Sequence, residues 1–147
     1  MDVNHGKYLG VDYGDVRTGL AECDVSGMLA GGIGTIAEGG MRNTAVRVVK
    51  EAEARGCKKI IIGLPKNMDG SEGFKAEAVR AFAAIIATLT EIPIDFYDER
   101  MSTMNAYRFL DESGTYGKKR KEVLDAVAAT VILENFMAYR KNHKDEQ

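Results

Sequence analysis

The spacing of hydrophobic residues changes along the chain, and the first part follows the pattern of β-strands. Short stretches of apolar and small residues, separated by turn residues, occur over residues 7–13, 17–23 and 28–36. This arrangement predicts three strands joined by tight turns. Because each strand follows the last so closely, we expect them to pair as an antiparallel meander.

From residue 43 onward, the pattern predicts helices that alternate with strands. Apolar residues three and four positions apart predict helices over residues 43–55 and 74–89, the second with Phe74 and Phe82 on its apolar face. Short apolar runs predict strands over residues 58–64 and 94–98, and two more helices are expected over residues 102–112 and 119–139. This order predicts an α/β fold with a mixed five-stranded sheet, its later strands parallel to the first, and helices on both faces.

Length and composition place these elements in one domain. The chain has 147 residues, 45% of them hydrophobic, which suits a single core over residues 1–147, with a charged tail from about residue 140 that we expect to fray. A net charge of −2 argues against a protein that coats nucleic acid through an overall positive field, but it permits local basic patches. Without a signal peptide or a membrane-length apolar run, the sequence predicts a cytoplasmic protein with no membrane partner. Cys23 and Cys57 lack metal-ligand spacing, so we expect buried free thiols.

The first predicted strand contains an unexpected carboxylate, Asp12, within "YLGVDYG". Strand alternation places Gly10 on the face of Asp12, and Gly14 stands at the same distance on the other side. Two glycines leave no side chain beside the carboxylate along its own strand, which leaves room for a ligand. The alternative is an aspartate that caps a turn, with Gly14 present for a positive φ.

Two further acids stand in unusual places. Asp125 is the only charged residue between residues 123 and 133, where the helix pattern is otherwise apolar, so it needs a bound cation or an ion pair with a lysine or arginine. Glu99 follows the strand predicted over residues 94–98, and strand ends are where α/β proteins form ligand sites. If the three acids converge, their repulsion favours a divalent cation, and such a site suits phosphodiester hydrolysis. The cation, Mg²⁺ or Mn²⁺, is left open.

Four motifs in the same order resemble those of a known family. They read "GVDYGDVRTGLA", "GLPKNMDGSEG", "DERMST" and "LDAVAATVILENF". The chain resembles the YqgF (RuvX-like) family of pre-16S rRNA nucleases, which is related to Holliday-junction resolvases and has an RNase H-like fold. The resemblance implies that Asp12, Glu99 and Asp125 are the catalytic, metal-binding acids, which are the three acids selected above. Asp98 and Asp69 remain alternatives for the middle acid.

Several polar and aromatic residues near these acids are candidates for substrate binding. In the motif "GLPKNMDGSEG", Lys66, Asn67 and free backbone N–H groups could hold a phosphate at the start of a helix. Alternatively, Asp69 or Ser71 could simply cap that helix. The run "KKRK" before Asp125 could contact a nucleic-acid backbone or be a solvated charge run. Tyr13 and Tyr97 could stack on a base or pack in the protein. The substrate-binding candidates are Arg17, Lys66, Asn67, Arg100, Lys119 and Arg120.

These features predict a metal-dependent nuclease that acts on structured RNA, in processing of the precursor of 16S rRNA, as a monomer or a homodimer. One alternative is a Holliday-junction resolvase on branched DNA. Another is a nucleic-acid-binding processing factor with little hydrolytic activity, although its acidic pI of about 5.7 disfavours binding without chemistry. A third alternative, an ATPase of the actin or sugar-kinase type, would need a second such domain around its nucleotide.

Overall fold

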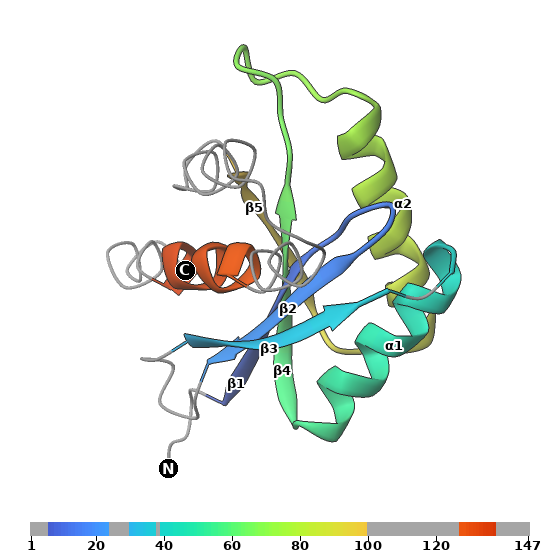
Figure 1. Cartoon of the computed structure of the whole chain (residues 1–147), viewed down its shortest axis with the longest axis vertical. Coiled ribbons are helices and arrows are strands. Elements are labelled where there is room, and N and C mark those ends of the chain that lie inside the picture. The colour runs from blue at the N-terminus through green and yellow to red at the C-terminus, as the bar shows by residue number, and fades with distance from the viewer. Residues whose placement is uncertain (1–5, 24–29, 38, 100–126, 138–147) are drawn as a thin grey trace, which may run out of the picture.

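The computed structural model describes residues 6–23, 30–37, 39–99 and 127–137, and its centre is a mixed sheet. The strands are β1 (Lys7–Asp12), β2 (Thr18–Cys23), β3 (Ala30–Ile36), β4 (Cys57–Leu64) and β5 (Ile94–Asp98). Their order is β3-β2-β1-β4-β5 (Figure 1). β1 to β3 pair antiparallel, whereas β4 is parallel to β1 and β5 is parallel to β4. The predicted fold class is confirmed.

Helices cover both faces of this sheet, as the sequence predicts. α1 (Met41–Ala54) and α2 (Phe74–Leu89) lie on one face, and the helical segment 127–137 lies on the other (Figure 1). The helix predicted over residues 102–112 lies outside the described residues, as do the tail and the ends of the helix predicted over residues 119–139. None of the helices in the described part of the chain has the length and apolarity that a membrane span requires.

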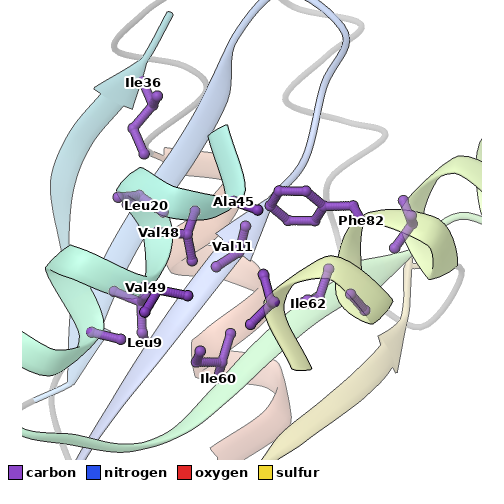
Figure 2. Packing of buried hydrophobic residues seen from close by; sticks show 14 of the residues in the cluster. Leu9, Val11, Leu20, Ile36, Ala45, Val48, Val49, Ile60, Ile62 and Phe82 are labelled. Atoms are coloured by element: carbon purple, nitrogen blue, oxygen red, sulfur yellow. The ribbon is translucent and has the colours of Figure 1, made fainter. Parts of the chain in front are cut away.

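The apolar run in β4 shows why the sheet needs two helical layers. Ile60 and Ile62 pack with α1 and α2, whereas Ile61 packs with the helical segment 127–137. Figure 2 shows the first of these cores, where Phe82 of α2 lies among side chains from β1 and β4. A strand that is covered on both faces carries apolar residues without alternation.

The buried face of α2 differs from the predicted one. Phe74 is 79% exposed, although Phe82 is fully buried as expected. The buried face includes two alanines, Ala76 and Ala83, which belong to the core between the helices and the sheet. The predicted face passed through Phe74 and Ala78 before Phe82, so it was wrong in the first turn, where Ala76 is the buried residue.

Both cysteines are buried thiols that form no disulfide, as the sequence predicts. Burial, and secondarily the nearby Glu22 carboxylate, raises the pKa of Cys57 to about 11. At pH 8 the reactive thiolate of Cys57 is therefore about a thousandth of the total, since reactivity follows the thiolate fraction. We expect iodoacetamide to leave Cys57 of the native protein unmodified for hours and to alkylate it rapidly in urea, as mass spectrometry would show. Fast labelling of native Cys57 would contradict this burial.

Candidate active site at the carboxyl edge of the sheet

Three segments with candidate residues meet at one edge of the sheet. β1, β4 and β5 are parallel neighbours, so their carboxyl ends lie at the same edge. Asp12 is the last residue of β1, the loop with Lys66 follows β4, and Glu99 follows β5. Open α/β sheets bind their ligands at this edge. The topology therefore brings these separate sequence motifs to one place.

Asp12 is a buried carboxylate whose neighbours on the adjacent strands are glycines. Its residue is only 6% exposed. On β2 it pairs with Gly19. On β4 the register pairs Val11 with Ile62, so the next position, Gly63, lies beside Asp12. Sequence reasoning missed Gly19 and Gly63 as parts of the site, because cross-strand neighbours depend on the register of pairing.

The two glycines along the strand of Asp12 make room for protein atoms, and the prediction that they give access to a ligand is wrong. A Cβ at Gly10 would lie 3.0 Å from the carbonyl oxygen of Ala129, so this glycine lets the helical segment 127–137 approach β1. A Cβ at Gly14 would collide with the carbonyl oxygen of Arg17 in the hairpin turn. Gly14 does not have a positive φ, so the alternative reason for that glycine is wrong as well.

The carboxylate of Glu99 lies over Gly63. A Cβ at Gly63 would be 2.7 Å from Oε2 of Glu99 and 3.2 Å from its Cγ. Because Gly63 is the neighbour of Asp12 on β4, Glu99 and Asp12 are on the same face of the sheet, the one covered by the helical segment 127–137. The structure thus brings together two of the three predicted acids from distant parts of the sequence.

The two alternatives for the middle acid lie elsewhere. Alternation along β5 places Asp98 on the face of Phe96, which packs against the core under α1 and α2, whereas Tyr97 packs on the opposite face. Asp69 is exposed, and its Oδ1 accepts hydrogen bonds from the backbone N–H of Ser71 at 2.9 Å and from its hydroxyl at 2.6 Å. This geometry favours Glu99.

Asp125 lies outside the described residues, two positions before the helical segment 127–137. That segment packs closely against the face that carries Asp12: Ala129 lies beside Gly10 and Ile132 beside Gly63. Within the described ranges, no group of three or more His, Cys, Asp or Glu side chains could hold a metal ion. A site with three acids therefore needs a residue from outside those ranges.

The loop after β4 is held by its own hydrogen bonds. Asn67 donates from its backbone N–H to the carbonyl of Ser71 at 2.8 Å and from Nδ2 to the Ser71 hydroxyl at 2.9 Å. The helix α2 begins at the N-cap Gly73 without a side-chain cap, so the expected caps, Asp69 and Ser71, are wrong. Those two side chains bond to each other instead. Lys66 is half-buried at the start of the loop.

The remaining candidates divide between the hairpin after β1 and the undescribed residues. Arg17 is half-buried in the turn between β1 and β2, next to Thr18, whose hydroxyl accepts a 3.3 Å hydrogen bond from the N–H of Gly14. It therefore lies at the same edge as Asp12. Arg100, Lys119 and Arg120 lie outside the described residues, and their roles stay predictions.

The tyrosines that flank the acids are used in packing. Tyr13 stacks on Phe82 with ring centroids 4.3 Å apart, and Tyr97 meets Phe136 edge-on at 6.4 Å. Burial, followed by a nearby aspartate charge, raises the pKa of both phenols. These contacts favour the packing interpretation over base stacking.

Comparisons with known proteins identify the family. The RuvX family, described as Holliday junction resolvase, matches residues 6–139. A "Putative pre-16S rRNA nuclease" of Pelotomaculum thermopropionicum is 38% identical over 132 residues (89% of this chain, 86% of that protein), and one of Halothermothrix orenii is 40% identical over 138 residues (91% and 96%). The solved structure of T. thermophilus RuvC in complex with a Holliday junction substrate has the same fold, with a TM-score of 0.59 at 14% identity over 94% of this chain and 97% of that chain. The predicted family and the RNase H-like fold are confirmed: the chain belongs to the RuvX family of nucleases.

Proposed function

We propose that this protein is a metal-dependent nuclease that hydrolyses phosphodiester bonds in the precursor of 16S rRNA. The observation that carries the proposal is the pair of carboxylates at the carboxyl edge of the sheet, with Asp12 buried in β1 and Glu99 lying over the neighbouring Gly63. The names of the relatives support the choice of RNA. The hydrophobic cores on the two faces of the sheet share its strands, which supports a single domain.

The chemistry of these side chains fits a divalent cation. Two carboxylates on one face repel each other, and they offer the oxygen ligands that Mg²⁺ and Mn²⁺ prefer. Asp12 and Glu99, completed by Asp125, would hold the ion. When bound, such an ion activates water and stabilises the leaving oxygen of a phosphodiester.

The packing of the helical segment 127–137 supports Asp125 as the third ligand. Ala129 lies beside Gly10, near the carboxyl end of β1, whereas Phe136, two turns later, contacts Tyr8 near the start of that strand. Following the segment backward toward Asp125 therefore leads toward the end of β1 that carries Asp12. This direction agrees with a shared site.

Other residues at this edge would bind and orient the substrate. The first turn of α2 lacks a side-chain cap, so its N–H groups can hold a phosphate beside Lys66 and Asn67. Arg17 lies in the hairpin that joins β1 to β2, so it would add positive charge on the β2 side of Asp12. Buried Asp12 stays fixed in its strand while these groups position the scissile phosphate.

The second candidate substrate is branched DNA, which the description of the family favours. Resolution of a junction requires two active sites related by two-fold symmetry, so this activity would require a homodimer, whereas RNA cleavage suits a monomer as well. Purified protein should be offered precursor 16S rRNA, a four-way junction, a matched linear duplex and single strands, each with Mg²⁺, Mn²⁺ or EDTA. We expect metal-dependent cleavage of the precursor RNA. Cleavage of the junction alone would move the assignment to a resolvase, and the absence of metal-dependent cleavage on every substrate would contradict the proposal.

The double variant Lys119→Glu/Arg120→Glu tests the "KKRK" run as a phosphate contact. If both side chains contact the backbone, the log–log slope of affinity against salt should become shallower by roughly two units, because phosphate contacts release counterions. The measurement is fluorescence anisotropy from low to moderate salt. Arg42→Glu/Lys50→Glu changes the charge equally at exposed positions on α1, which lies on the sheet face opposite the helical segment 127–137, and should leave the slope unchanged. An unchanged slope for Lys119→Glu/Arg120→Glu would show that the "KKRK" run is a solvated charge run that does not contact the nucleic-acid backbone.

A further inference from the structure

Gly63 of β4 lies where neighbouring side chains leave no room for a Cβ atom. It follows three isoleucines in a strand, and its φ is not positive, so its backbone conformation does not require glycine. A Cβ at this position would lie 2.5 Å from Cδ1 of Ile132 and 2.7 Å from Oε2 of Glu99. One apolar and one acidic side chain therefore share the volume that any larger residue would fill.

We propose that Gly63 is a positioning residue of the active site: it has no side chain, and this lets the Glu99 carboxylate lie on the sheet beside Asp12. The inference rests on the proposed function, in which these two acids hold a divalent cation. A side chain at position 63 would lift the Glu99 carboxylate off the strand, away from its partner. The spacing of the two acids would then suit the ion less well.

The surroundings determine which group moves when a methyl group is added at position 63. The backbone of β4 is held on both sides, since Ile62 pairs with Val11 and Leu64 pairs with Asp98. Ile132 is fully buried in the core of its face and has little room to move. Glu99 is only half-buried, after the end of β5, so its carboxylate is the group that yields. The protein should therefore fold with a displaced acid.

The variant Gly63→Ala tests this displacement through metal binding as well as cleavage. We expect the dissociation constant for Mn²⁺, measured by electron paramagnetic resonance, to rise roughly tenfold, the lower end of what loss of a ligand-orienting residue causes. Urea unfolding should show a folded, cooperative protein. Gly31→Ala on β3 is the matched control, because its Cβ would have nothing within 4 Å and its φ is not positive. It should bind Mn²⁺ like the wild type.

Two double variants separate positioning of the acid from packing of the helix. Gly63→Ala/Ile132→Val removes Cδ1, the atom nearest the added methyl, so it should recover any lost stability without recovering the Mn²⁺ affinity. In a Glu99→Gln background, Gly63→Ala should cause no further loss of affinity, because residues that act through one another are not additive.

The outcomes that would overturn the inference differ from those that bear on the nuclease activity. If the wild type binds Mn²⁺ but cleaves no nucleic acid, only the proposed function is contradicted. The inference about Gly63 is tested by Mn²⁺ affinity and does not depend on cleavage. Wild-type affinity in Gly63→Ala, full recovery through Ile132→Val, or additive losses with Glu99→Gln would each show that Gly63 only makes room for the helix.

Discussion

Asp12→Asn should lower the rate of phosphodiester cleavage about a thousandfold, which corresponds to about 4 kcal/mol of transition-state stabilisation. Asparagine keeps the size of the side chain but removes the negative charge that would hold the cation, and a metal ion supplies several kcal/mol in such reactions. The residue is buried at the end of β1, so a substitute ligand cannot easily take its place. Single-turnover cleavage of precursor RNA in Mg²⁺ measures the effect.

The stability of the same variant separates a catalytic role from a structural one. Because the substitution removes one of two like charges on one face, the free energy of unfolding should hold or rise. Urea unfolding without metal checks this expectation. A variant that fails to fold, or a folded one with wild-type turnover in Mg²⁺, would rule out Asp12 as a metal ligand.

Glu99→Gln should lower cleavage about a hundredfold, whereas Asp98→Asn should change it less than about threefold, differences of about 2.7 and 0.6 kcal/mol. The two substitutions are adjacent and remove the same charge, so each serves as the control for the other. The expected difference follows from the positions of the two side chains: Glu99 lies over Gly63 on the face of Asp12, whereas alternation along β5 places Asp98 on the opposite face.

The reverse result would reassign the middle acid. If Asp98→Asn is inactive and Glu99→Gln keeps wild-type turnover, the position of Glu99 over Gly63 has no catalytic meaning. Rates should be compared at saturating Mg²⁺ and again at limiting Mg²⁺, because a weakened metal site is partly rescued by more metal. A rescue that is confined to Glu99→Gln would strengthen its assignment as a ligand.

Local periodicity explains why most of the fold could be predicted from the sequence. Alternation along residues 8–13 depends only on the strand period of two, so the face that Asp12 shares with Gly10 was predicted correctly. Helical spacing did not place Phe74 correctly, because the buried face of α2 begins at Ala76 and Phe74 lies outside it.

The details of the site depend on contacts between elements, which a single sequence does not contain. Gly63 and Gly19 became neighbours of Asp12 only through the register of β1 with β4 and β2. Likewise, Phe96 and Tyr97 are both aromatic, so the sequence does not say which of them faces α2, and the choice between Asp98 and Glu99 depends on that.

The most direct test of the central claim is a crystal structure of the protein grown with Mn²⁺, with the ion located by anomalous diffraction. The proposal predicts an anomalous peak bound by carboxylate oxygens of both Asp12 and Glu99, at about 2.1–2.2 Å as for hard cations of this size. An ion bound elsewhere, with the Asp12 carboxylate paired to a lysine or arginine, would contradict it.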